Sequence, residues 1–216
     1  MSPILWSFRR CPYAMRARLA VAASGITVEL REILLRDKPD AFVAASAKAT
    51  VPVLVQTDGT ILEESRDIMF WALGQNDPEN WLACWHQDKA KVTAFLDELD
   101  GPFKTHLDRY KYDSRYEGED AITHRSAGAA FLQRIDSILA TQPWLSGGAA
   151  GLMDYASLPF IRQFRIADPD WFDHQPWPHL HPWLQGFLDA AQFAAIMTKY
   201  TPWQDGERGI AFPAAS

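Results

Sequence analysis

The chain has 216 residues, of which 48% are hydrophobic and 12% aromatic, and this composition excludes an intrinsically disordered protein. The formal net charge of −6 argues against nucleic acid as the main partner. No apolar window approaches the ~18 residues of a membrane span, and we expect no signal peptide at the N-terminus. The two cysteines, Cys11 and Cys84, cannot form a disulfide framework. We therefore expect a soluble protein of a reducing, cytoplasmic compartment.

The first third of the chain alternates between short strand patterns and short helix patterns. Strands are predicted at residues 4–6, 27–33 and 51–55, and a return strand at 61–62 follows the Asp58-Gly59 turn. Helices are predicted at residues 12–25, 38–47 and 65–74, the last ended by Gly74, Asp77 and Pro78. The alternation indicates a small α/β domain.

Cys11 lies where the first strand gives way to the first helix. Pro12 suits the first helical position because it has no N–H to lose there, which makes Cys11 the candidate N-cap residue. A thiolate at that position meets the unpaired N–H groups and the positive dipole end of the helix. Positive charge nearby comes from Arg9, Arg10, Arg16 and Arg18. The alternative, a buried and inert cysteine, fits the flanking arginines poorly, so we predict a reactive thiol.

Pro52 and Ser7, which lie in or next to predicted strands, each indicate local structure. Pro52 stands inside a strong strand pattern, where a proline argues for an edge strand or for a cis peptide bond. Ser7 ends the first strand, and its hydroxyl is interpreted as bonded to the backbone. The alternative is that the Ser7 hydroxyl helps to activate a thiol by hydrogen bonding to it.

After residue 78 the pattern changes to long helices. Apolar residues recur at helical spacing from residue 86 to residue 110, and Gly101-Pro102 should bend this helix. A second helix is predicted from about residue 120 to residue 140. A third opens at Gly151, where the Asp154 carboxylate can accept the Gly151 N–H but the reciprocal side-chain bond is lost. We interpret Asp154 as structural.

The remaining aromatic and polar residues fit a packing role. The proline-rich segment after residue 168 carries four aromatic residues, most of which should pack in the core or between domains: Trp171, Phe172, Trp177 and Trp183. The His179-Leu180-His181 pattern has no further ligand at suitable spacing, so no metal site is predicted. Cys84 should pack in the linker region.

Taken together, several motifs resemble the glutathione transferase family, in particular its cysteine-type members such as the omega class and related bacterial proteins. The motifs are Ser7-Phe8-Arg9-Arg10-Cys11-Pro12-Tyr13, Asp37-Lys38-Pro39, Thr50-Val51-Pro52-Val53-Leu54 and Glu64-Ser65-Arg66-Asp67-Ile68. The resemblance implies a thioredoxin-like α/β domain at residues 1–76, a linker at 77–85, and an all-α domain at 86–216. It also implies a homodimer.

The resemblance further implies a site for the co-substrate glutathione. Cys11 would face the glutathione sulfur, and the other predicted glutathione-binding residues are Pro12, Lys38, Val51, Pro52, Glu64 and Ser65. A carboxylate and a hydroxyl at a helix N-terminus suit the charged γ-glutamyl end of glutathione. The expected electrophile pocket between the domains is lined by Phe8, Tyr13, Phe103, His106 and Tyr110.

Three functions follow as expectations. The first is glutathione-dependent thiol transfer or disulfide reduction through Cys11, of the thioltransferase or dehydroascorbate-reductase kind, in which a second glutathione resolves a mixed disulfide. No second cysteine follows Cys11, so two-cysteine cycling, as in a glutaredoxin-like reductase, is disfavoured. The second is conjugation of glutathione to a small-molecule electrophile. The third is a non-catalytic binding protein on the same fold.

Overall fold

The computed structural model describes residues 2–214 and divides the chain into two compact units. The α/β unit comprises Met1–Glu79 and Ala190–Ser216, and the helical unit comprises Asn80–Asp189. The predicted helical domain, residues 86–216, is therefore wrong at its C-terminal end, because the segment after residue 189 packs on the α/β unit instead. The helical unit also begins inside the predicted linker at 77–85. Residue 1 and residues 215–216 of the predicted ranges lie outside the described residues.

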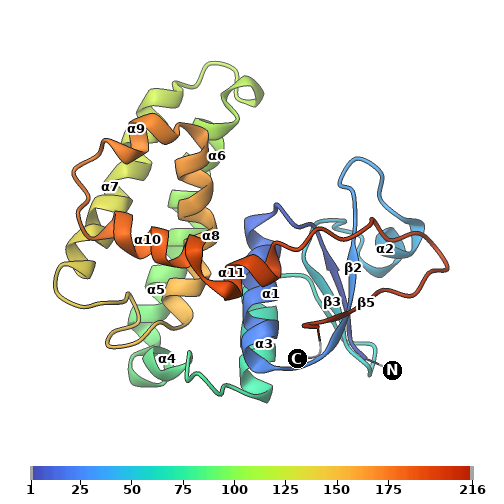
Figure 1. Ribbon diagram of the computed structural model, residues 1–216. Helices are drawn as coiled ribbons and strands as arrows, with labels where there is room; N and C mark the ends of the chain where they lie inside the picture. Colours follow the sequence, from blue (N-terminus) through green and yellow to red (C-terminus); the bar gives the residue numbers. More distant parts are fainter. Residues whose placement is uncertain (1, 215–216) are drawn as a thin grey trace. The chain divides into compact units, whose positions relative to one another are not determined.

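The α/β unit is built on one sheet with strand order β4-β3-β1-β2-β5 (Figure 1). β1 pairs parallel with β2, and the other three pairings are antiparallel. The elements of this unit are β1 (Ile4–Ser7), α1 (Pro12–Ser24), β2 (Val28–Glu32), α2 (Asp40–Ala45), β3 (Val53–Val55), β4 (Ile61–Leu62), α3 (Ser65–Gln75), α11 (Ala191–Ile196) and β5 (Ile210–Phe212). The predicted strands and helices of residues 4–74 are confirmed, with small differences at their ends.

Helices α1 and α3 lie side by side on one face of the sheet, and α2 covers the other face (Figure 1). The strand pleat sends alternate side chains to these two faces. Trp6 points to the α2 side, where its ring lies 5.4 Å from Phe42 and 5.0 Å from Trp203 between centroids. Its neighbours in β1, Leu5 and Ser7, are fully buried on the face that carries α1.

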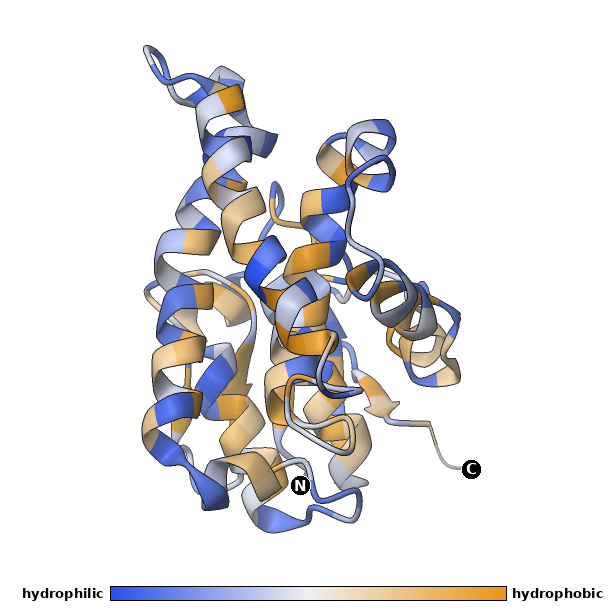
Figure 2. Cartoon of the chain, turned by 90° about the vertical axis from the view of Figure 1, so that its left-hand side faces the viewer, coloured by the Kyte–Doolittle hydropathy of each residue, from blue (hydrophilic) through white to orange (hydrophobic). Residues whose placement is uncertain are grey.

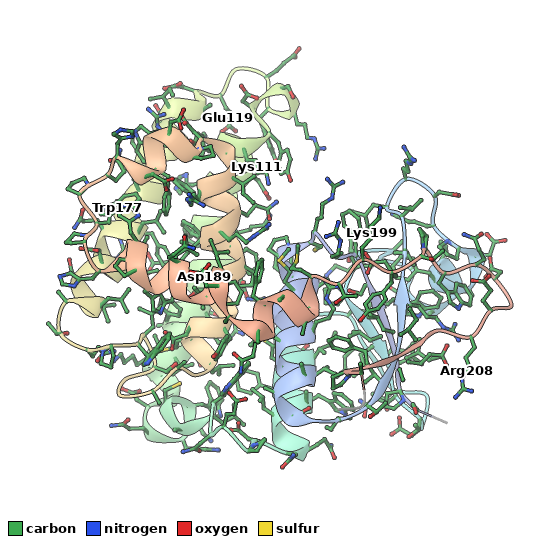
Figure 3. All side chains as sticks on the ribbon, viewed as in Figure 1. Lys111, Glu119, Trp177, Asp189, Lys199 and Arg208 are labelled. Atoms are coloured by element: carbon green, nitrogen blue, oxygen red, sulfur yellow. The ribbon has the colours of Figure 1, made fainter. Side chains whose placement is uncertain are left out.

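The C-terminal segment, residues 190–214, runs along the α/β unit after α11, and Lys199 and Arg208 mark its course in Figure 3. The backbone N–H of Trp203 donates to the backbone carbonyl of Glu32 at 2.8 Å. After this contact, β5 pairs with β2 at the edge of the sheet. Gly209 allows this approach, because a Cβ there would lie 2.7 Å from the Leu30 carbonyl oxygen. β5 was not predicted from the sequence.

The helical unit contains α4 (Ala83–Gln87), α5 (Lys89–Glu98), a π-helical segment (Leu99–Phe103), α6 (Lys104–Lys111), a 3₁₀ turn (Asp113–Arg115), α7 (Ala121–Leu139), α8 (Leu152–Ala167), α9 (Pro169–Asp173) and α10 (Leu180–Asp189). The predicted bend at Gly101-Pro102 coincides with the π-helical segment, where Pro102 cannot donate to a regular helical ladder. The predicted helix of residues 120–140 is confirmed as α7, and Asp120 caps it by accepting the Ile122 and Thr123 N–H groups.

The start of α8 has the predicted contact between Asp154 and Gly151, and a further contact from Ser146 that was not predicted. Asp154 is fully buried and accepts the Gly151 N–H at 3.1 Å, as predicted. It also accepts the Leu145 N–H at 2.8 Å and the Trp183 indole N–H at 3.0 Å, which supports its structural role. The hydroxyl that Gly151 lacks is supplied by Ser146, whose Oγ accepts the Met153 N–H at 3.1 Å.

Apolar side chains of the helical unit gather in its interior. Phe172, Trp177 and Trp183 are buried, as predicted, and Trp171 is half-buried. Cys84 is buried in α4 as a free thiol. Figure 2 shows hydrophilic and hydrophobic residues interleaved around the helices. Among residues 2–214, no helix is long and apolar enough to cross a membrane.

Candidate functional site

Cys11 occupies the N-cap position of α1, as predicted. Its backbone is extended (φ −76°, ψ 123°), its N–H donates to the Phe8 carbonyl at 3.0 Å, and its carbonyl accepts the Met15 N–H at 2.9 Å. Pro12 begins the helix behind it. The side chain is half-buried and is a free thiol. A thiol so placed lies at the positive end of the helix dipole, where an anion is favoured.

The Val51-Pro52 peptide lies next to this thiol. The Cys11 Sγ is 3.6 Å from the Val51 carbonyl oxygen, a distance at which the thiol can donate a hydrogen bond. The peptide bond between Val51 and Pro52 is cis, the second of the two alternatives predicted for Pro52, and both residues are buried. The structure therefore brings Cys11 next to the Val51-Pro52 peptide, although Val51 follows Cys11 by forty positions in the sequence.

Ser65 and Glu64 begin α3 but have different surroundings. Ser65 is buried, and its Oγ accepts a hydrogen bond of 2.9 Å from the Arg16 Nε of α1. The Glu64 side chain is 59% exposed and forms an ion pair with Lys48. This pair raises the pKa of Lys48. Lys48 was not predicted as a site residue, because nothing in the sequence pattern distinguishes it from a solvated surface lysine.

Lys38 lines a separate shallow pocket of about 210 Å³. The other residues that line this pocket are Asp37, Pro39, Asp40, Gln204 and Asp205. Asp205, from the C-terminal segment, accepts the N–H groups of Asp40 and Ala41 at the start of α2. Lys38 is thus exposed in a largely acidic pocket whose lining does not include Cys11.

Ser7 is fully buried at the end of β1. Its carbonyl accepts the Ile33 N–H at 2.9 Å, but its hydroxyl has no hydrogen-bond partner within residues 2–214. The prediction that the Ser7 hydroxyl bonds to the backbone is therefore wrong. The strand order explains this: Ser7 is in register with Glu32 of β2 on the face that α1 covers, so its side chain meets buried side chains and not a free backbone group.

The predicted electrophile-pocket residues of the α/β unit lie beside arginines. The Arg10 guanidinium lies 5.5 Å from the centre of the Phe8 ring, and the Arg16 guanidinium lies 5.3 Å from the centre of the Tyr13 ring. Such contacts are typical of cation–π pairs. Phe8 and Tyr13 are each half-buried.

The three predicted electrophile-pocket residues of the helical unit differ in how deeply they are buried. Phe103 is 1% exposed, and its ring stacks on Phe131 at 4.5 Å, so within this unit it is a core residue and lines no open surface. Tyr110 is half-buried, with its ring 5.0 Å from that of Phe164, and burial raises its pKa. His106 is half-buried too.

His106 belongs to a chain of polar contacts that the sequence did not predict. Its Nδ1 lies 2.8 Å from the Nδ1 of His124, and the His124 Nε2 contacts the carboxylate of Glu119. Burial, followed by the charges of His124 and Arg109, lowers the pKa of His106. Glu119 lies on the loop between α6 and α7, where it is labelled in Figure 3. Within the described residues, no group of three or more His, Cys, Asp or Glu side chains is arranged to hold a metal ion.

Two family models match the chain, one for each predicted domain. The "Glutathione S-transferase, N-terminal domain" model matches residues 5–81, and the "Glutathione S-transferase, C-terminal domain" model matches residues 88–190. The segment that forms β5 follows the second matched range.

Individual relatives agree with these models. A probable glutathione transferase of Aplysia californica is 44% identical over 55 residues, which are 26% of this chain and 60% of that protein. Glutathione S-transferase omega-1 of Rattus norvegicus is 38% identical over 61 residues, 28% of this chain and 25% of that protein. The chain thus matches less than two thirds of the length of either relative.

Solved structures match over nearly the whole chain. A glutathione S-transferase from Methylobacillus flagellatus KT, with GSH bound, superposes with a TM-score of 0.79 at 20% identity, and the match covers 90% of this chain and 98% of the other. At that identity the match shows a common fold. The two matched domain models and this shared two-domain fold show that the chain belongs to the glutathione S-transferase family.

Proposed function

We propose that the protein is a glutathione transferase whose Cys11 thiolate forms a mixed disulfide with glutathione. The observation that carries the proposal is the position of Cys11 at the N-terminus of α1, with its sulfur 3.6 Å from the Val51 carbonyl beside the cis Val51-Pro52 peptide. In this position a substrate sulfur can approach the thiolate while the neighbouring backbone binds the peptide part of glutathione.

The reaction begins with attack by the Cys11 thiolate on the glutathionyl sulfur of a mixed disulfide. The Cys11–S–S–glutathione bond forms, the substrate's S–S bond breaks, and the substrate leaves as a thiolate. A second glutathione thiolate then attacks the glutathionyl sulfur on Cys11. This step releases oxidised glutathione and restores the Cys11 thiolate. Each mixed disulfide reduced therefore consumes one free glutathione, and the glutathionyl group of the substrate becomes the other half of the oxidised glutathione.

Glutathione itself is proposed to lie along the Val51-Pro52 peptide with its γ-glutamyl end at the start of α3. Glu64 would pair with the glutamyl ammonium, and the Ser65 end of α3 would receive the glutamyl carboxylate. Lys38 is proposed to meet the glycyl carboxylate, and Pro12 to contact the thiol end. The exposed carboxylate of Glu64 supports its part, because the Glu64–Lys48 pair is open to a ligand.

Other parts of the proposal concern the second substrate and the assembly. Phe8 and Tyr13 are proposed to contact a small-molecule electrophile, which makes conjugation a second activity of the same site. We also propose a homodimer and a reducing, cytoplasmic location, in which Cys11 and Cys84 remain free thiols. Light scattering of the purified protein measures the assembly state directly.

The decisive experiment uses intact mass spectrometry on a Cys84→Ala background, where Cys11 is the remaining thiol. After incubation with oxidised glutathione, we expect one glutathionyl adduct, and Cys11→Ser should show none. Cys11→Ser should also lose disulfide-exchange activity but retain conjugation of an aryl halide, since a hydroxyl can still stabilise a glutathione thiolate. A protein that forms no adduct and loses conjugation on Ser7→Ala would instead assign the chemistry to Ser7.

Binding is tested separately by calorimetry with reduced glutathione. Glu64→Gln removes a charge-assisted bond of about 1.5–3 kcal/mol, so affinity should fall about tenfold or more. Glu117→Gln, an exposed change in the helical unit, is the matched control. Equal affinities for the two variants would place the γ-glutamyl site elsewhere, and absence of any binding would favour the non-catalytic scaffold.

A further inference from the structure

Arg18 is a charged residue buried inside the α/β unit. It follows Cys11 by seven residues, two turns of α1, and so lies on the same face of the helix as the thiol. Its side chain is 0% exposed. A guanidinium is costly to bury without partners, so the contacts of Arg18 identify the groups that hold this charge in place.

Those contacts lead to the turn that carries Cys11. The Arg18 Nη2 donates to the Arg9 carbonyl at 2.8 Å, and the Arg18 Nη1 lies 3.5 Å from the Glu32 Oε2. The Glu32 Oε1 in turn accepts the Arg9 N–H at 2.5 Å. Arg18 and Glu32 therefore bind the backbone carbonyl and the backbone N–H of Arg9, which lies in the turn between Phe8 and Cys11. This turn closes with the bond from the Cys11 N–H to the Phe8 carbonyl.

The Arg18 charge is only partly compensated by hydrogen bonds. Within residues 2–214, its Nε and Nη1 and the Glu32 Oε2 have no hydrogen-bond partner, so Arg18 and Glu32 interact as charges at 3.5 Å and not as a close bidentate pair. A positive charge in a region of low dielectric acts over a longer distance than one at the surface.

The charges that act on Arg18 come from β2, from the turn before α1 and from the C-terminal segment. Burial lowers the pKa of Arg18 to about 10, whereas the charges of Glu32, Cys11 and Tyr200 oppose this shift and that of Arg9 adds to it. With a pKa near 10, the guanidinium remains protonated at neutral pH. Burial raises the pKa of Glu32, and the Arg9 N–H and the Arg18 charge oppose that rise. Because the interaction between Cys11 and Arg18 is mutual, Arg18 favours the Cys11 thiolate.

We propose that Arg18 is a positioning residue for Cys11: its buried charge favours the thiolate, and its bond to the Arg9 carbonyl fixes the turn that presents the sulfur at the start of α1. The inference rests on the proposed function in taking Cys11 as the reacting thiol. Glu32 is the counter-charge that makes burial of Arg18 tolerable and limits its effect on the thiol.

The test is the pH dependence of Cys11 alkylation by iodoacetamide on the Cys84→Ala background, with thermal unfolding to verify folding. Arg18→Met should move the midpoint to higher pH and slow alkylation at pH 7 by about three- to tenfold, the effect of roughly 0.5 to 1 unit in the thiol pKa. At about pH 10, where the thiol is ionised in every variant, the rates should converge. A general loosening of the turn would not produce that convergence.

Two variants sharpen the result. Glu32→Gln removes the counter-charge and should move the midpoint to lower pH, the opposite direction from Arg18→Met. Arg31→Met is the matched control, because Arg31 is also paired with a glutamate of β2, Glu29 at 2.7 Å, but stacks on Trp203 across the sheet. Its midpoint should equal that of the parent.

An unchanged midpoint in folded Arg18→Met overturns the inference. If Arg18→Met does not fold, Glu32→Gln decides alone: a lower midpoint supports the inference, and an unchanged one overturns it. Because alkylation needs no glutathione, these outcomes are independent of the proposed function. The alkylation midpoint of Cys11 could depend on Arg18 even if Cys11 forms no adduct with oxidised glutathione. That result would contradict the proposed thiol-transfer function but support the role of Arg18.

Discussion

The Ser65 Oγ accepts a hydrogen bond of 2.9 Å from the Arg16 Nε, which links the first residue of α3 to the interior of α1. Both side chains are buried. Ser65 therefore supports the fold as well as the proposed glutathione site, whereas its neighbour Glu64 is exposed and forms a surface ion pair with Lys48.

This contrast predicts different effects on stability. Ser65→Ala removes the acceptor of the buried, charged Arg16 Nε–H group and should lower the free energy of unfolding by about 1–3 kcal/mol. Glu64→Ala should change it by less than about 1 kcal/mol, because an exposed ion pair contributes little. Urea denaturation of the two variants measures both values. Equal losses would mean that the Arg16 bond has no net effect on stability.

The start of α8 provides a second prediction. A Cβ at Gly151 would lie 3.0 Å from Ser146 Cβ and Oγ and from the Trp81 carbonyl oxygen. Gly151→Ser should therefore destabilise the protein, although serine is a preferred N-cap residue. Ser146→Ala should cost about 1 kcal/mol through loss of the acceptor for the Met153 N–H.

A double-mutant cycle in urea tests the Gly151 prediction. In Ser146→Gly/Gly151→Ser the steric conflict with Ser146 is gone, so the double variant should lose less stability than the two single changes combined. Additive losses would show that the Trp81 carbonyl, and not Ser146, limits the space at Gly151.

The contact between β5 and β2 predicts a sharp requirement for glycine. Gly209→Ala would place a methyl group 2.7 Å from the Leu30 carbonyl oxygen, which is backbone and cannot move aside, so β5 should detach and amide exchange of β2 should accelerate. Gly148→Ala is the control, because a Cβ there meets nothing within 4 Å. Wild-type exchange rates in Gly209→Ala would contradict the described approach of the two strands.

His106 predicts a pH dependence of stability. Its pKa is lowered in the folded protein, so as pH falls below the ordinary value of 6.5 the unfolded chain binds the proton first, and stability should decrease. His106→Gln should reduce this decrease. His124→Gln should raise the pKa of His106, which NMR titration of the imidazole signals measures, and a pKa that does not rise would show that burial alone lowers it.

The α/β unit could be predicted because its signals are local. The Asp58-Gly59 turn, the proline after Cys11 and the apolar strand residues each act through their own backbone preferences. The position of Cys11 at the helix N-terminus follows from the same kind of signal. Pro52 by itself left two alternatives open, an edge strand and a cis peptide bond, and the structure has the cis bond.

Features that depend on distant parts of the chain could not be predicted. β5 has three residues, with Ile210 and Ala211 exposed, and it forms only because Gly209 approaches β2. Arg18 and Glu32 belong to different elements, and each alone is typical of a solvent-facing residue. Their burial as a pair depends on the packing of α1 against β2, which no pattern within either segment reveals.

The pairing of β5 with β2 has a consequence for synthesis of the chain on the ribosome. β2 is complete at Glu32, but its partner at Ile210–Phe212 follows the entire helical unit, Asn80–Asp189, in the sequence. Until the ribosome has released that later segment, one edge of the sheet carries unpaired backbone groups of the kind that recruit foreign strands. The nascent chain therefore exposes this sheet edge while the helical unit is being made, and the pairing of β5 with β2 ends that exposure.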